Sequence, residues 1–170
     1  YIMDTSKALK TVTTLCSKKE YCRQEIRQKL EKWEIAEKDI DTILEFLQKN
    51  NFINEQRYAQ FYARDKFRFN KWGKQKISLM LKQKEIAPDF ISQALSELDK
   101  EAYEQTCLQL FRQKQLKFKE KKDIQNTPRL VRFGLSRGFD YDTIRRCLDL
   151  LKAENHSAFP ENTRDDVWDE

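Results

Sequence analysis

Apolar side chains recur along this chain with one spacing that is found three times. In the middle of the chain they are Ile77, Leu81, Ile86, Ile91, Leu95 and Leu98. Upstream the same spacing holds Ile26, Leu30, Ile35, Ile40, Leu44 and Leu47. Downstream we place it at Val131, Leu135, Phe139, Ile144, Leu148 and Leu151, with one residue missing before Phe139. Corresponding positions 40, 91 and 144 give periods of 91 − 40 = 51 and 144 − 91 = 53. Self-similarity at such a period is typical of a repeat array whose units bury their apolar faces against their neighbours.

The breaks between the apolar segments predict three short helices in each repeat. We therefore expect an all-α fold, in which tandem repeats of three-helix units form an elongated, curved helical array. The repeats are predicted to cover residues 1–53, 54–99 and 100–153. Residues 154–170 are acidic and have no helical periodicity, so we expect a disordered tail there.

Capping and breaking residues mark several of the predicted helix ends. Asn54 is a favourable N-cap for a long helix in the central repeat, and Pro88 stands where the first residue of a later helix is expected. Thr127 and Pro128 predict a helix start of the same kind in the third repeat. Gly138 then predicts a helix end, and Asp140 predicts the cap of the last helix.

The composition supports helices with solvated outer faces. The 170 residues include 3 Gly and 3 Pro, while 36% of the chain is charged. Few helix breakers and many charges are typical of amphipathic helices. No apolar segment is long enough to span a membrane, and the N-terminus has no signal-peptide pattern. We expect a monomeric cytoplasmic protein.

The sequence offers no set of residues typical of catalysis or metal binding. It has four cysteines, at positions 16, 22, 107 and 147, no CxxC pair, and a single histidine, His156. It contains no P-loop, HExxH or GxSxG motif. We therefore predict no catalytic residue, no metal and no cofactor, and we interpret the cysteines as reduced thiols packed as small apolar groups.

Charge alternates along the chain in phase with the repeats. Residues 56–84 carry nine Lys or Arg against one acid, and residues 112–137 carry nine against two. Residues 85–104 instead sum to −5 and residues 31–55 to −4. Such blocks are usually just solvated faces, but their phase with the repeat indicates one basic and one acidic side.

Two phrases of the sequence resemble the RecX family of regulatory proteins. The first runs from Asn54-Glu55-x-Arg57-Tyr58-Ala59-x-x-Tyr62 to Gly73-x-x-Lys76-Ile77-x-x-x-Leu81-x-x-Lys84-x-Ile86. The second is Ser136-Arg137-Gly138-Phe139-x-Tyr141-Asp142-x-Ile144, near the end of the third repeat. Glu85 departs from the family pattern, which has Gly before Ile86.

The resemblance implies a helical protein without a catalytic site that binds the RecA recombinase filament on single-stranded DNA. It further implies negative modulation of strand exchange and of ATP hydrolysis, and hence a role in DNA repair, recombination and the SOS response. From their basic character we select candidate contacts to DNA phosphates or to acidic patches of the recombinase: Arg57, Arg64, Arg68, Lys71, Lys74, Lys76, Arg129 and Arg132.

The alternative is a helical DNA-binding protein that acts through a basic face without a recombinase partner. Aromatic residues interleave with arginines in the segment FYARDKFRFNKW. Of these aromatics we expect Phe61, Tyr62 and Phe67 in the core, and Phe69 and Trp72 at the surface. A third class, an enzyme, has no supporting motif.

Overall fold

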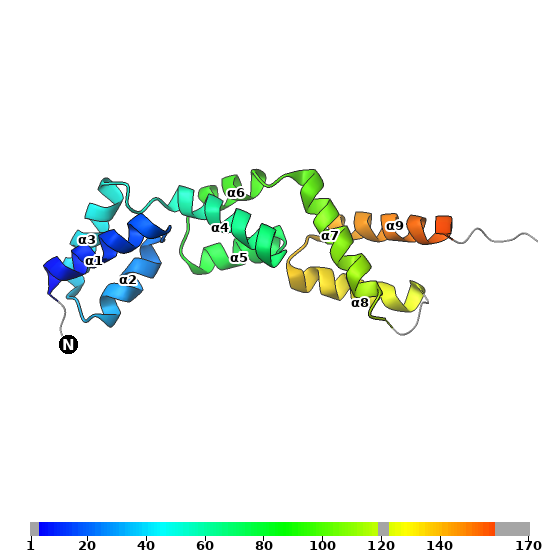
Figure 1. The fold of residues 1–170 in the computed structure, drawn as a ribbon, viewed down its shortest axis with the longest axis horizontal. Coiled ribbons are helices and arrows are strands. Elements are labelled where there is room, and N and C mark those ends of the chain that lie inside the picture. Colours follow the sequence, from blue (N-terminus) through cyan, green and yellow to red (C-terminus); the bar gives the residue numbers. More distant parts are fainter. Residues whose placement is uncertain (1–3, 119–122, 159–170) are drawn as a thin grey trace, which may run out of the picture. The chain divides into compact units, whose positions relative to one another are not determined.

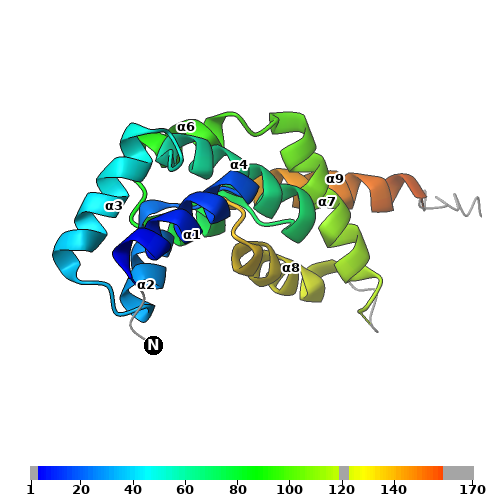
Figure 2. The ribbon, with the colours of Figure 1, turned by 60° about the vertical axis from the view of Figure 1, so that its left-hand side comes forward.

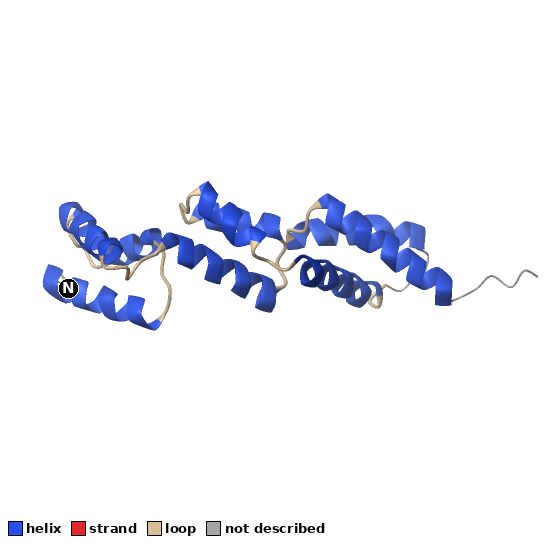
Figure 3. Cartoon of the chain, turned by 90° about the horizontal axis from the view of Figure 1, so that it is seen from above, coloured by secondary structure: helices blue, strands red, loops and turns tan. Residues whose placement is uncertain are grey.

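The computed structural model describes residues 4–118 and 123–158, and the side chains of 4–118 and 126–154. In this part of the chain all regular structure is helical (Figure 1; Figure 3). The helices are α1 (Thr5–Lys18), α2 (Arg23–Lys32), α3 (Glu37–Lys49), α4 (Glu55–Asn70), α5 (Lys74–Gln83), α6 (Pro88–Ser96), α7 (Lys100–Gln115), α8 (Asp123–Arg137) and α9 (Tyr141–Ala158). The all-α repeat fold expected from the sequence is therefore confirmed. The chain forms two compact units, Tyr1–Lys100 and Glu101–Glu170.

The first unit contains two helical trios, α1–α3 and α4–α6 (Figure 2). Each trio has a hydrophobic core of its own. The six repeating apolar positions of the first trio are all buried. Those of the second trio are buried except Leu95, which is half-buried. Each trio thus buries its apolar stripes mainly within itself, whereas we expected burial against the neighbouring repeat. Cys22 is the exception, because it belongs to the second core although it precedes α2 of the first trio.

The turn between the second and third helix has the same geometry in all three repeats. Its central residue is Glu34, Glu85 or Gly138, with φ of 58°, 60° and 88° respectively. The next residue is buried and donates its N–H to the carbonyl five residues earlier, over 3.1 Å from Ile35, 3.2 Å from Ile86 and 3.1 Å from Phe139. This is the Schellman end of a helix, which needs a left-handed residue at its centre. Glu85, where the family pattern has Gly, thus keeps the geometry of the turn.

The third repeat follows this pattern in a register one residue earlier than the sequence predicted. Leu130 is buried and Val131 only half-buried, while Leu135 is 50% exposed. With Leu130 and Gly134 in place of Val131 and Leu135, the spacing equals that of the other repeats and no residue is missing. The prediction was wrong because a glycine occupies a position where the other repeats have leucine.

Gly134 lies at a close contact between helices in the second unit. A Cβ atom there would lie 2.9 Å from Ile144 and 2.9 Å from the ring of Phe111. Phe111 and Ile144 are fully buried, and they fill the space that a leucine side chain fills at this position of the other repeats.

Most predicted helix ends are confirmed, and one is wrong. Asn54 accepts a hydrogen bond from the N–H of Arg57 at 2.9 Å, and Asp140 accepts one from Thr143 at 2.9 Å. Pro88 is the first residue of α6. Pro128, however, lies inside α8, which begins at Asp123, not at Thr127. The proline sits in the second turn of the helix, where its missing N–H removes only one bond.

The predicted tail begins later than expected. Helix α9 continues to Ala158, and Glu154, which we placed in the disordered tail, forms an ion pair with Arg112 of α7. The guanidinium Nε of Arg112 donates to Glu154 at 3.1 Å. The rest of the predicted tail, residues 159–170, lies outside the described residues. The residue boundaries assigned to the three repeats stay a prediction.

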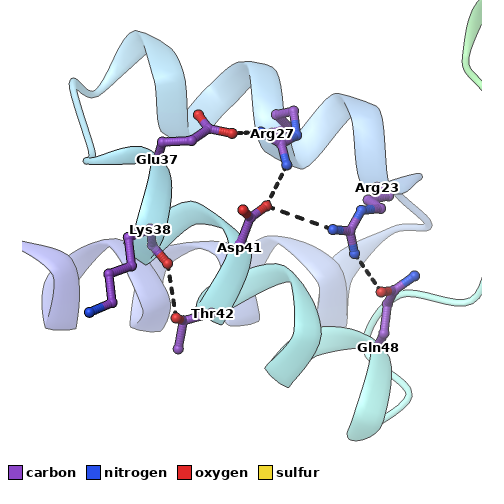
Figure 4. Close-up of polar contacts among 7 residues, drawn as sticks. All are labelled: Arg23, Arg27, Glu37, Lys38, Asp41, Thr42 and Gln48. Atoms are coloured by element: carbon purple, nitrogen blue, oxygen red, sulfur yellow. Dashed lines mark hydrogen bonds and ion pairs between the residues drawn. The ribbon is translucent and has the colours of Figure 1, made fainter.

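Polar contacts join α2 to α3 on the surface of the first trio (Figure 4). Arg27 forms ion pairs with Glu37 and, at 2.6 Å, with Asp41. Arg23 donates to Gln48 at 2.6 Å. Because these carboxylates are half-exposed or more, each pair contributes at most about 1 kcal/mol. The buried apolar stripe therefore decides how these two helices pack.

Replacing Glu85 by glycine should stabilise the protein. A non-glycine residue with positive φ costs roughly 1 kcal/mol, offset in part by the entropy that glycine adds to the unfolded chain. We expect Glu85→Gly to raise the free energy of unfolding by about 0.5 kcal/mol, measured by urea denaturation. Gly138→Ala, the reverse change at the equivalent turn, should lower it. A loss of stability in Glu85→Gly would contradict the strain argument.

Replacing Gly134 by alanine should destabilise the second unit although alanine favours helices. The added methyl group meets Ile144 and Phe111 at 2.9 Å, and such overpacking costs about 1–3 kcal/mol against a helix-propensity gain of about 1 kcal/mol. We expect a lower melting temperature by differential scanning calorimetry. Ser136→Ala, on the exposed side of the same helix, serves as the control and should have little effect. A Gly134→Ala protein as stable as the control would mean that the three helices do not meet this closely.

Candidate functional site

Helices α4 and α5 and the turn between them carry six of the eight predicted contact residues. Arg57, Arg64 and Arg68 lie on α4 at positions that share one face of the helix. Lys71 follows at the left-handed end of α4, with φ of 55°. Lys74 and Lys76 lie in the first turn of α5.

Arg57 is engaged inside the protein. Its Nε donates to Glu20 at 2.7 Å, and its other nitrogens donate to the carbonyl and the side-chain oxygen of Asn51 at 3.2 and 3.3 Å. Both ionic partners are less than one-third exposed. Arg57 therefore joins α4 to the segment before α2. This geometry favours a structural role for Arg57 over the predicted contact with an external partner.

The remaining α4 cations are more accessible. Arg64 pairs with Glu97 at 3.2 Å but keeps 61% of its side chain exposed. Arg68 and Lys71 are exposed, and the Lys71 ammonium donates to the carbonyl of Arg68 at 2.7 Å. Among the described residues, neither of these two forms an ion pair with a carboxylate. Arg68 and Lys71, at the end of α4, are thus the cations best placed to meet an anionic partner.

Arg129 and Arg132 lie on α8, in the second unit, and both are exposed. The guanidinium of Arg129 lies 5.7 Å from the ring centroid of Phe118. The structure therefore gathers the six cations of α4 and α5 on one unit and places these two on the other.

Glu25 is the centre of a polar cluster that joins the two trios of the first unit. It accepts hydrogen bonds from the ammonium of Lys84 at 2.7 Å, from the hydroxyl of Tyr58 at 3.1 Å and from the N–H of Cys22 at 3.3 Å. Burial raises the pKa of Glu25, but these hydrogen bonds and the charge of Lys84 outweigh it, so that the pKa lies below its usual value. Burial lowers the pKa of Lys84, and Glu25 more than offsets this. Both groups are thus held in their charged forms.

A groove of about 780 Å³ opens above this cluster. It lies between the end of α1 with the segment that follows it and helices α4 and α5. Its lining residues are Cys16, Ser17, Lys18, Lys19, Glu20, Glu25, Tyr58, Phe61, Tyr62, Asp65, Lys66, Trp72, Met80 and Lys84. Trp72 was predicted at the surface, but it is half-buried and packs against the second core.

The aromatic predictions were correct for Phe69, which is 70% exposed, and wrong for Phe61, which is 49% exposed and lines the groove. Lys18, Lys19, Lys66 and Lys84 also line it, and none was among the predicted contacts. The sequence signal available was the aromatic–basic segment of α4, but Lys18 and Lys19 reach the groove through the packing of the first trio against the second.

The described residues show no arrangement typical of a metal site. They contain no cluster of three or more histidine, cysteine, aspartate or glutamate side chains able to hold an ion. The four cysteines are free thiols, and burial raises the pKa of Cys22 to about 11, so its thiolate is scarce at neutral pH. No helix in the described part of the chain is long and apolar enough to cross a membrane.

Comparison with known proteins identifies the family. Models of the first and second three-helix domains of RecX match residues 8–47 and 54–95. The regulatory protein RecX of Chlorobium phaeobacteroides (strain BS1) is 32% identical over 148 residues, which cover 87% of this chain and 95% of that relative. The chain belongs to the RecX family.

Other RecX proteins show how far the similarity extends. The regulatory protein RecX of Clostridium perfringens (strain 13 / Type A) is 33% identical over 144 residues, which are 84% of this chain but 65% of that relative's length. The crystal structure of RecX from Lactobacillus salivarius superposes with a TM-score of 0.79 at 23% identity, over 88% of this chain and 97% of that one. At this identity the superposition shows that the RecX fold is shared.

The Glu25 cluster makes the stability of this RecX chain depend on pH. Because the pKa of Glu25 is lowered in the folded state, its contribution is present above the ordinary value of 4.5 and is lost as the pH falls through the folded value. We expect Glu25→Gln to cost about 1–3 kcal/mol at pH 7, since it leaves the half-buried Lys84 without its carboxylate. The cost should shrink below pH 4. Urea denaturation at both pH values checks this.

Glu31→Gln is the matched control, because Glu31 is exposed on the same helix. It should have little effect at either pH. An equal loss in Glu25→Gln at pH 7 and pH 3 would contradict the charge argument.

Proposed function

We propose that this chain is a regulatory protein that binds the RecA recombinase filament on single-stranded DNA and negatively modulates its recombination and ATPase activities. The observation that carries the proposal is membership of the RecX family, whose curated members in the comparison are named regulatory proteins. We further propose that the chain acts in the cytoplasm as a monomer, by binding and not by catalysis.

The exposed cations of the first unit support a contact with a highly charged assembly. A nucleoprotein filament presents phosphates and acidic side chains along its length, and long-range attraction accelerates association with such a surface. Arg68 and Lys71 supply positive charge that is not consumed by internal ion pairs among the described residues. Arg64 adds a charge that is partly balanced by Glu97. Arg129 and Arg132 are candidates for a second contact from the other unit.

The alternative, a helical DNA-binding protein without a recombinase partner, is favoured by one observation, the aromatic–lysine groove. The two functions differ in a direct test. ATP hydrolysis by the cognate recombinase on single-stranded DNA should fall as the chain is titrated in at substoichiometric amounts. Inhibition that appears only at concentrations where the chain coats all the DNA would support the alternative.

The paired reversal Arg68→Glu and Lys71→Glu should weaken this inhibition. Two surface contacts worth roughly 0.7 kcal/mol each correspond to about a tenfold rise in the half-inhibitory concentration. Arg57 is left unchanged because it holds Glu20 inside the protein. The matched control is Lys38→Glu with Lys49→Glu, which makes the same charge change at exposed positions of α3. Equal inhibition by the two double variants, with circular dichroism still helical, would rule out this surface.

A further inference from the structure

We propose that the groove between the end of α1 and helices α4 and α5 is a binding site for single-stranded nucleic acid, with bases stacked on its aromatic rings and phosphates held by its lysines. The inference rests on the proposed function, because that function identifies the strand as the single-stranded DNA on which the recombinase filament forms. It assigns a direct contact with that strand to this groove.

Aromatic rings on which nucleic-acid bases could stack line the groove. Phe61 is 49% exposed, and Tyr62 and Trp72 line the same groove. Tyr62 and Trp72 pack against the second core on one side, which fixes their orientation without a ligand. Stacking on such rings is tolerant of base identity, because every base has a π face.

Lysine ammonium groups lie beside two of these rings, Tyr62 and Trp72. The Nζ of Lys66 lies 5.4 Å from the ring centroid of Tyr62 and 5.2 Å from that of Trp72. The Nζ of Lys76 lies 4.6 Å from the Trp72 ring. In a nucleic-acid strand a phosphate lies next to every base, so cations beside aromatic rings match its chemistry. When bases stack on the rings, the ammonium groups of these lysines would move from the ring faces to the phosphates.

The charge balance of the groove favours an anion. Two of its three carboxylates already have internal partners, Glu20 with Arg57 at 2.7 Å and Glu25 with Lys84 at 2.7 Å. Asp65 opposes an anionic ligand, and Lys18, Lys19 and Lys66 outnumber it. Lys18 and Lys19 are exposed at the end of α1, on the side of the groove opposite α4.

The size and chemistry of the groove point to a short strand segment. Its volume of about 780 Å³ lies within the range of about 300–1,000 Å³ typical of sites for small organic ligands. An acidic peptide would also meet the lysines, but it would not account for the exposed Phe61 and the half-buried Tyr62 and Trp72 beside them. Because lysines contact phosphates and rings stack on any base, the site should bind without sequence preference.

The test uses the full chain without recombinase and a fluorescently labelled single-stranded oligothymidylate, followed by anisotropy. We expect binding whose log Kobs falls with log salt concentration with a slope of about −2 to −3, as expected for three or four phosphate contacts. The variant Lys18→Gln, Lys19→Gln, Lys66→Gln should bind at least about tenfold more weakly. The matched control Lys38→Gln, Lys49→Gln, Lys82→Gln changes charge equally at exposed positions outside the groove and should bind within about twofold of the parent.

Trp72 supplies an independent readout. The oligonucleotide should quench tryptophan emission in the parent, and this quenching should be lost in Trp72→Phe, which keeps an aromatic ring in the core contact. Trp72→Ala should weaken binding at least about fivefold. If circular dichroism shows that Trp72→Ala does not fold, the site is still tested by comparing the quenching of the parent with that of Trp72→Phe.

Three outcomes would overturn the site: no binding of the oligonucleotide, equal losses in the groove and control triple variants, or polyglutamate binding as tightly as the oligonucleotide. Failure here and failure of the proposed function are distinguishable, because recombinase ATP hydrolysis is measured separately. Inhibition that persists without oligonucleotide binding rejects the groove alone. Oligonucleotide binding without inhibition rejects the recombinase function alone.

Discussion

The bond from the Ile86 N–H to the Leu81 carbonyl, with its counterparts at Ile35 and Phe139, determines how each repeat is built. It ends the second helix, reverses the chain over one left-handed residue and places the next apolar side chain in the core. The third helix can then pack its own stripe on the second. This small unit of backbone geometry recurs at a nearly constant interval, which is why a repeat is visible in the sequence at all. The left-handed glutamates in two of the turns show that the tertiary packing outweighs the local strain.

The sequence specified the features that depend on local periodicity. The caps at Asn54 and Asp140 were identified, because a helix end is decided within a few residues. The register of the third repeat was missed, since Gly134 carries no apolar side chain and its place is filled by Phe111 from another helix. A glycine at a helix crossing is recognisable only when the neighbouring helices are known. The start of α8 was misplaced for a related reason, because Pro128 is tolerated where one backbone bond is lost.

The candidate site was predicted less well than the fold, because charge in a sequence does not reveal its partner. Arg57 looked like its neighbours on α4, yet it is bound by Glu20, which lies 37 positions earlier in the chain. Lys18 and Lys19 were not among the predicted contacts, yet they line a groove with residues of α4 and α5. Both outcomes depend on how one trio packs on the next. The sequence could therefore indicate that α4 is basic and aromatic, but not which of its side chains remain available.

The sulfur of Cys22 belongs to the core of the second trio, although the residue is the cap of a helix in the first. Three residues later, Glu25 reaches Tyr58 and Lys84 across the same boundary. A segment from one trio thus completes the interior of the other, so the two are not interchangeable modules. A chimera that exchanged a single trio between two relatives would therefore have to keep Cys22 and Glu25 matched to the downstream trio.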